Sequence, residues 1–416
     1  HAAPLSDRME ERLERWVLHR VWGPLLLVVL LFLMFQAVFA WAQPLMDGID
    51  AGMGMLGQAV GQMLPPGVIR SLIVDGIIAG AGSVVTFLPQ ILILFLWILV
   101  LEESGYLPRA AFLLDRFMSV AGLSGRSFIP LLSSFACAVP GIMATRTIQN
   151  PRDRLITILI APLMTCSARL PVYTLLIGAF IPHRSIAGFL NLQGLVLFVL
   201  YAIGIGSALL VARVLRWRDT DRQEATLLME LPAYRLPNPR DLALGLWERA
   251  RIFLVRVGTT IVSLTVLLWG LSSFPPPPAG APGPAIDWSL AGRIGHLMLP
   301  VFAPLGFNWQ ICVALIPGLA AREVAVGALA TVYSLGSGTD TDQAASQLGQ
   351  MLPTHWSLAT ALSLLAWYVY APQCVATLAV IRRETLSWSV VGLAAGYLFA
   401  LAYAAAFLTY HIALMF

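Results

Sequence analysis

The sequence predicts an all-α polytopic membrane protein of about eight transmembrane helices, with two re-entrant or broken-helix hairpins in an inverted repeat. Hydrophobic residues fill 58% of the 416 positions and charged residues only 12%, whereas soluble domains carry about 25% charged residues. Several apolar runs reach the roughly 20 residues needed to cross a bilayer. Two of these runs are interrupted by proline, glycine and charge, and such backbone is tolerated where protein surrounds it.

The charged residues indicate topology. All 26 basic residues are arginine, and the net charge is +4. Arginines that flank apolar spans follow the positive-inside rule, so they do not indicate a nucleic-acid partner. The four cysteines lie in apolar segments, which does not favour a disulfide framework; they are Cys137, Cys166, Cys312 and Cys374.

The first two segments are an amphipathic helix and a span. Residues 1–22 are predicted to form a juxtamembrane helix, because apolar residues recur between charges in DRMEERLERWVLHR. Residues 23–70 hold the first span and a loop that is expected to be external, since it is poor in arginine. The chain begins with His1 instead of methionine, so we expect its N-terminus to be incomplete or replaced.

The next segment, residues 71–214, contains the stretch SSFACAVPGIMATRT at 133–147. Basic residues flank this stretch on both sides. A single crossing would place one basic flank outside, whereas a hairpin that enters and leaves on the cytoplasmic side removes the conflict. Pro140 and Gly141 are the expected helix breakers there.

The remaining chain comprises a cytoplasmic loop, residues 215–251, and a second half, residues 252–416. This half starts with a span and contains a second broken segment, interrupted by Pro317, Arg322 and Glu323. The loop that follows has no arginine, so we expect this hairpin to enter from the external side.

Two short patterns recur in the halves. CSARLPV at Cys166 and CVATLAV at Cys374 share C-x-A-x-L-x-V, and each follows a proline, Pro162 or Pro372. Such an order of hairpin and broken span in both halves indicates an internal repeat.

The hairpins themselves align when Gly141 is matched with Gly327. In that register Cys137 corresponds to Glu323. Opposite sidedness makes the repeat inverted, and transporters built this way bind substrate near the bilayer midplane on discontinuous helices.

The residues at these breaks suit a metal ion. Cys137, Cys166, Cys374 and Glu323 are the candidates for transport or gating, and thiolates with a carboxylate favour a transition ion such as Fe²⁺, Mn²⁺ or Zn²⁺. Packing is the alternative for each cysteine, and it is our interpretation of Cys312. A second alternative is that the cysteines act as redox gates.

Two arginines accompany these candidates. Ionisable groups within spans are functional or pair with one another. Glu323 is therefore expected either to form an ion pair with Arg169 or Arg322 or to act directly as a ligand.

Enzymatic functions find no support in the motifs. The sequence contains no H-E-x-x-H, G-x-S-x-G or phosphate-loop pattern. Besides a carrier of another divalent metal, the open alternatives are a nucleoside-type carrier and a non-transporting membrane anchor.

Motifs along nearly the whole chain resemble one family. LEESGYLPRAAFLLDR, CAVPGIMATRT, CSARLPVY, MELPAYRLPNPRD, GLAAREVAVGAL and QCVATLAVIRRET are similar to the membrane domain of the bacterial ferrous-iron transporter FeoB family. The resemblance implies two Gate-type halves, with Cys137, Cys166 and Cys374 in iron passage and Glu323 in an R-E-V motif.

The same resemblance implies a setting and partners. We expect a multi-pass protein of the bacterial inner membrane with a cytoplasmic N-terminus and Fe²⁺ as transported substrate. The implied partners are the lipid bilayer, the cytosolic GTP-binding domain of the full-length protein, a small Feo accessory protein and a second copy of the chain. GTP hydrolysis resides in that N-terminal domain, so no nucleotide is expected to bind this chain.

Overall fold

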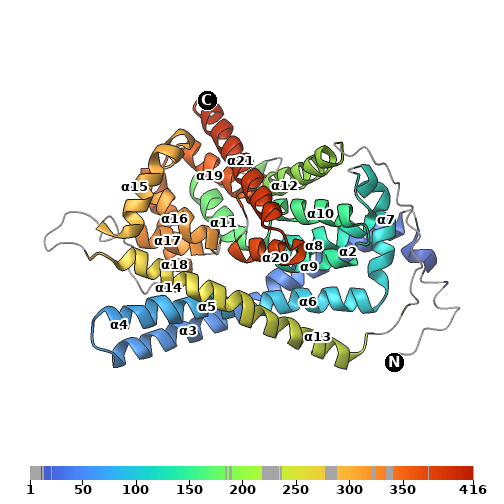
Figure 1. The fold of residues 1–416 in the computed structure, drawn as a ribbon, viewed down its shortest axis with the longest axis horizontal. Helices are drawn as coiled ribbons and strands as arrows, with labels where there is room; N and C mark the ends of the chain where they lie inside the picture. Colours follow the sequence, from blue (N-terminus) through green and yellow to red (C-terminus); the bar gives the residue numbers. More distant parts are fainter. Residues whose placement is uncertain are drawn as a thin grey trace. The chain divides into compact units, whose positions relative to one another are not determined.

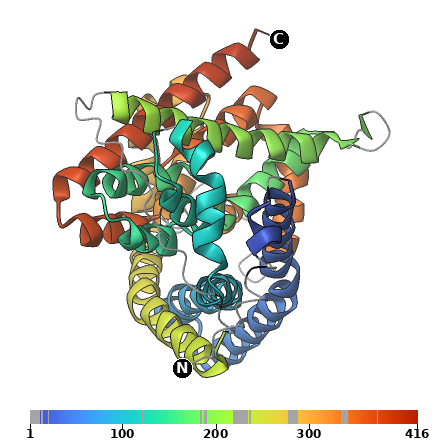
Figure 2. The ribbon, with the colours of Figure 1, turned by 90° about the vertical axis from the view of Figure 1, so that its right-hand side faces the viewer.

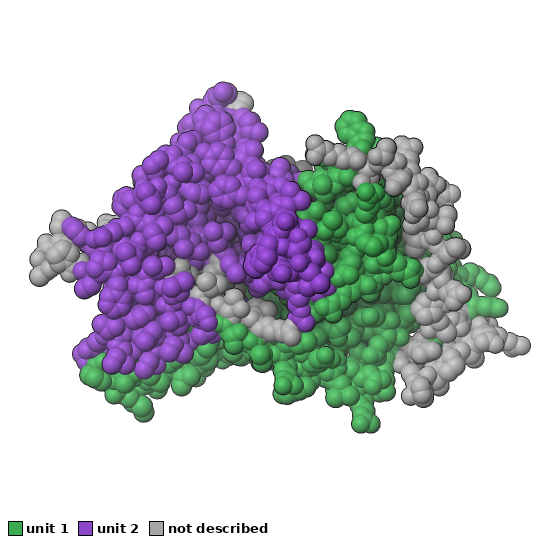
Figure 3. Space-filling model, in the orientation of Figure 1, with its two compact units in different colours: residues 1–65, 78–161, 209–260 green, residues 66–77, 162–208, 261–416 purple. Residues whose placement is uncertain are grey.

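The computed structural model is a predominantly helical chain. It describes residues 11, 14–19, 21–120, 122–182, 185–186, 190–217, 234, 237–276, 288–320, 322, 324–333, 341–372 and 374–415. The chain divides into two compact units (Figure 3). Unit 1 comprises residues 1–65, 78–161 and 209–260, and unit 2 comprises residues 66–77, 162–208 and 261–416.

The first half of the chain forms these helices (Figure 1): α2 (Trp22–Gln36), α3 (Gln43–Met63), α4 (Val68–Ser71), α5 (Ala79–Thr86), α6 (Leu88–Glu103), α7 (Tyr106–Val120), α8 (Phe128–Ala136), α9 (Ala138–Ala144), α10 (Pro151–Ile160), α11 (Leu170–Phe180) and α12 (Leu192–Trp217). Two π-helical turns, Ala37–Trp41 and Leu72–Ile78, link α2 to α3 and α4 to α5. A short antiparallel pair, β1 (Ser185–Ile186) and β2 (Leu190–Asn191), precedes α12.

The second half continues with α13 (Pro239–Ile252), the π-helical turn Phe253–Gly258, α14 (Thr259–Ser273), α15 (Leu290–Phe302), α16 (Trp309–Ala320), α17 (Val324–Val332), α18 (Thr341–His355), α19 (Leu358–Tyr370), α20 (Val375–Thr385) and α21 (Trp388–Ala413). Helices α19 and α21 pack side by side (Figure 1 and Figure 2). Their inner faces bury Leu364, Ala402 and Ala406, and Phe302 and Leu305 belong to the same core.

The apolar helices are long enough for a multi-pass membrane protein. Within the part of the chain that the structure describes, five runs reach spanning length: Val68–Glu103, Pro151–Phe180, Leu192–Trp217, Leu358–Thr385 and Trp388–Ala413. A bent pair, Leu290–Leu305 with Trp309–Leu319, turns by 103° and makes a sixth. Two shorter apolar helices, Trp22–Met34 and Ile261–Ser273, add to the described set. The expected membrane class is therefore confirmed.

The segment expected as a loop after the first span is largely helical. Helix α3 occupies residues 43–63 and has a proline in its first turn, where the absent N–H is not needed. Gly57 and Gly61 are buried on α3, and Met53 packs against Gly82 of α5. Small residues let the two backbones approach closely, and this packing stabilises a helix that local composition disfavours.

Proline positions explain some breaks but not all. Pro317 was expected to break its segment, yet α16 continues through it to Ala320, so this expectation is wrong. Helices α15 and α17 both pack against α16, and such neighbours stabilise a proline-containing helix within a membrane. The bend lies earlier, where Gly306 takes the left-handed conformation at φ 76°; glycine does so at no steric cost.

Candidate functional site

Cys137 stands at a break between two short helices. It takes an extended conformation, with φ −155° and ψ 131°, between α8 and α9. Pro140 has no N–H with which to bond the carbonyl of Ala136, four residues earlier. Helix α8 ends at Ala136. Pro140 thus sits in the first turn of α9, three residues after the break at Cys137.

Close packing holds α8 and α9 together. A Cβ atom built on Gly141 would lie 2.0 Å from Ser134 Oγ and 2.7 Å from the Pro130 carbonyl oxygen. The Ser134 hydroxyl is buried and donates to that same carbonyl at 2.8 Å. At Gly141 the two helices therefore come into close contact, which a larger residue would prevent. Gly141 lies inside α9 and not at the break.

Cys166 stands at the second break. Helix α10 ends at Ile160, Pro162 lies in the 3₁₀ turn that follows, and Cys166 precedes another 3₁₀ turn, Ser167–Arg169. The Cys166 carbonyl accepts the Arg169 N–H at 3.1 Å. Its side chain is buried.

Cys374 stands at the third break. It caps the N-terminus of α20 after α19 has ended at Tyr370, and Pro372 lies between the two helices. Its sulfur atom lies 3.4 Å from Thr377 Oγ1, and its carbonyl accepts the Thr377 N–H at 2.9 Å. All three candidate cysteines thus interrupt helices, while Cys312 lies within α16 in the core of unit 2.

Two buried arginines bind the backbone at the third break. Arg169 donates to the carbonyls of Val369 at 2.7 Å and of Pro162 at 3.1 Å. Arg322 donates to the carbonyl of Ala371 at 2.5 Å and also to that of Pro372. The last carbonyls of a helix have no partner within the helix and carry partial negative charge. Both guanidinium groups therefore cap the end of α19.

Unit 2 brings these arginines close to one cysteine. Arg169 and Cys166 both lie within electrostatic reach of Arg322. Tyr173 is fully buried, and it is close enough to interact electrostatically with Arg169, Arg322 and Cys166.

Other predicted contacts stay untested. Glu323 lies outside the described residues, so its expected pairing with an arginine remains a prediction. Among the residues that the structure describes, no three His, Cys, Asp or Glu side chains gather as a metal-binding group. Cys137 belongs to unit 1, whereas Cys166 and Cys374 belong to unit 2.

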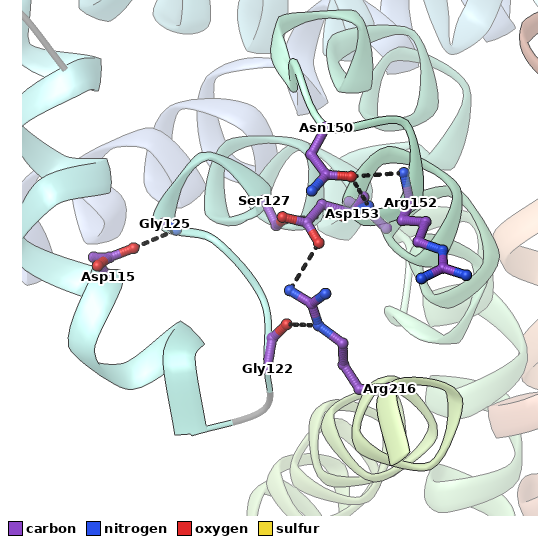
Figure 4. Close-up of polar contacts among 9 residues, drawn as sticks. Asp115, Gly122, Gly125, Ser127, Asn150, Arg152, Asp153 and Arg216 are labelled. Carbon is purple, nitrogen blue, oxygen red and sulfur yellow. Dashed lines mark hydrogen bonds and ion pairs between the residues drawn. The ribbon is translucent and has the colours of Figure 1, made fainter. Parts of the chain in front are cut away.

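A polar cluster within unit 1 was not expected from the sequence (Figure 4). Arg216, at the end of α12, forms an ion pair with Asp153 at 2.9 Å and donates to the Gly122 carbonyl at 2.6 Å. Asp153 is buried in the first turn of α10, where Asn150 caps the helix. The pattern N-P-R-D predicts the start of a helix, because it combines an N-cap residue, a proline in the first turn and an acidic residue near the helix N-terminus. Nothing local indicates Arg216.

We expect Arg216→Gln to lower the free energy of unfolding by about 2 kcal/mol, because removing one partner leaves a buried carboxylate unpaired while the partly exposed arginine is screened by solvent. Thermal unfolding in detergent measures the effect. Arg240→Gln is the matched control, since the Arg240 side chain is exposed on α13. Equal melting temperatures for the two variants would contradict an energetic role for this ion pair.

Within unit 1, the buried Arg109 connects the described part of the N-terminal segment to α7. Arg109 donates to Glu14 at 2.8 Å and lies 3.7 Å from the centroid of the Tyr234 ring. Burial and the neighbouring Tyr234 raise the pKa of Tyr106 to about 12. The described part of residues 1–22 is therefore anchored through Glu14 to α7.

Two known families and several known proteins match this sequence. The Gate family, described as nucleoside recognition, matches residues 84–180 and 254–388. The family described as ferrous iron transport protein B C terminus matches residues 197–249. The Fe(2+) transporter FeoB of Leptospira interrogans serogroup Icterohaemorrhagiae serovar copenhageni is 40% identical over 98% of this chain and 60% of its own length. The chain belongs to the Gate family and fits the C-terminal membrane part of FeoB.

Further proteins named FeoB are similar to this chain over most of its length. The Fe(2+) transporter FeoB of Leptospira biflexa is 42% identical over 93% of this chain and 57% of its own length. A fusion protein of Porphyromonas gingivalis, named Fe(2+) transport protein A/Fe(2+) transporter FeoB, is 38% identical over 98% of this chain and 52% of its own length. The chain thus spans about three fifths or less of these relatives. No solved structure matches it.

Proposed function

We propose that this chain carries ferrous iron across the bacterial inner membrane. The observation that carries the proposal is the 40% identity, over 98% of the chain, to a protein named Fe(2+) transporter FeoB. The multi-pass set of apolar helices supports it. Fe²⁺ is the substrate in this proposal, and Mn²⁺ or Zn²⁺ is the alternative, because the ligand type selects a class of ions and not one ion.

The proposed pathway is lined by Cys137, Cys166 and Cys374, with Glu323 as a further ligand or gate. The position of each cysteine at an interrupted helix supports this assignment, since discontinuous helices hold the ion sites of inverted-repeat transporters. The repeats are residues 71–214 and 252–416, within about eight spans and two re-entrant hairpins.

The proposal includes partners from the rest of the protein. The N-terminus is cytoplasmic and adjoins a GTP-binding domain, and the chain associates with a second copy. The fusion relative joins Fe(2+) transport protein A to FeoB in one chain, which favours a small accessory protein as a partner.

Uptake of Fe²⁺ into proteoliposomes tests the function. We expect an inward Fe²⁺ gradient to drive influx above that of protein-free liposomes, and an excess of nucleoside to leave the influx unchanged. Influx no greater than in protein-free liposomes would contradict transport and would favour a membrane anchor. Inhibition by nucleoside would instead favour a nucleoside-type carrier.

A further inference from the structure

Arg169 is rooted in the same turn as a candidate cysteine. Its N–H bonds the Cys166 carbonyl at 3.1 Å, which closes the 3₁₀ turn Ser167–Arg169. Its guanidinium also bonds the Pro162 carbonyl at 3.1 Å. Arg169 therefore fixes the backbone on both sides of Cys166.

The same guanidinium reaches the other cysteine break of unit 2. It donates at 2.7 Å to Val369, which lies 200 residues further along the chain in the last turn of α19. Arg322 holds the rest of that turn through Ala371 and Pro372. Cys374 follows Pro372 after one residue and begins α20. A short, bonded path thus connects the backbone at Cys166 with the backbone at Cys374.

Burial makes this path stiff. The exposed fraction is 0% for Arg169 and 2% for Arg322, so water does not replace their bonds to carbonyl groups. A buried carbonyl or guanidinium that is left without a hydrogen-bond partner destabilises the fold. The planar fork of arginine can bond two separate carbonyls at once, which the single ammonium of lysine does not reproduce.

We propose that Arg169 is a positioning residue that fastens the Cys166 break to the Cys374 break, so that both sulfur atoms are presented to one metal ion. This rests on the proposed transport of a transition metal, and it adds a residue that touches no metal itself. Outer contacts of this kind orient metal ligands, and their loss typically lowers metal affinity by about 10- to 100-fold.

Cobalt binding tests the proposal, because Co²⁺ bound to thiolates gives a charge-transfer absorption that reports sulfur ligation directly. The parent is the full chain with Cys137→Ser and Cys312→Ser, which leaves Cys166 and Cys374 as its cysteines. In this parent we expect a thiolate band, and in the Arg169→Gln variant a weaker band and a Co²⁺ affinity lower by about 10- to 100-fold. Arg169→Lys should not restore either quantity.

The controls separate positioning from general destabilisation. Arg216→Gln in the same parent removes a contact of unit 1, so it should lower the melting temperature and leave the band and the affinity unchanged. An unchanged band and affinity in Arg169→Gln, or their full recovery in Arg169→Lys, would overturn the proposal. A parent without any thiolate band would instead refute sulfur ligation by this pair, and with it the positioning role of Arg169, while Fe²⁺ influx tests the transport function separately.

Discussion

Replacing Cys137, Cys166 and Cys374 together by serine is expected to lower Fe²⁺ influx into proteoliposomes by at least about tenfold, since even outer-shell changes at metal sites have effects of this size. Serine keeps the approximate size of cysteine but offers a hard hydroxyl in place of a soft thiolate. Each side chain stands where a helix is interrupted, so serine should preserve the local fold better than a larger residue.

Cys312→Ser is the matched control for this experiment. Cys312 lies fully buried inside α16 and not between two helices, so its replacement should leave the influx unchanged. Undiminished influx in the triple variant would contradict the ligand role of the cysteines. A change of influx caused by an oxidant alone would favour redox gating, whereas weaker metal binding in acid would favour ligation, because thiols must lose protons to bind metal.

The largest effect on stability is expected for Gly141→Ala. The new Cβ would lie 2.0 Å from Ser134 Oγ and 2.7 Å from the Pro130 carbonyl oxygen. Relieving the second contact requires a shift of the α8 backbone, and overpacking of this kind costs about 1–3 kcal/mol, occasionally more. We therefore expect a lower melting temperature in detergent and, since α8 and α9 flank Cys137, reduced Fe²⁺ influx.

Gly327→Ala provides the comparison within the same chain. Gly327 aligns with Gly141 in the proposed repeat, yet a Cβ atom there meets nothing within 4 Å. Alanine should stabilise α17 by about 0.5–1 kcal/mol, because glycine weakens a helix interior. Equal melting temperatures for the two variants would show that α8 and α9 separate at no cost, contrary to their close packing.

Local sequence patterns predicted the membrane class and the neighbourhood of the breaks. Apolar runs of spanning length identify membrane helices because a bilayer excludes unpaired backbone groups. Proline acts locally too, and Pro162 and Pro372 both lie between helices. Near Pro140 the helix is interrupted three residues earlier, at Cys137, because proline cannot bond the carbonyl of residue i−4, which is Ala136. Such consequences depend on a few neighbouring residues, so the sequence by itself determines them.

Tertiary structure decided the rest. Whether Pro317 breaks a helix depends on the neighbours of α16. The helical state of α3 depends on its packing against α5, where Met53 contacts Gly82. The partners of Arg169 and Arg216 are a carbonyl 200 residues away and a carboxylate on another helix. A charge in a sequence shows that a partner is needed, but only the folded chain selects which group satisfies it, since contacts between distant segments depend on how the helices pack.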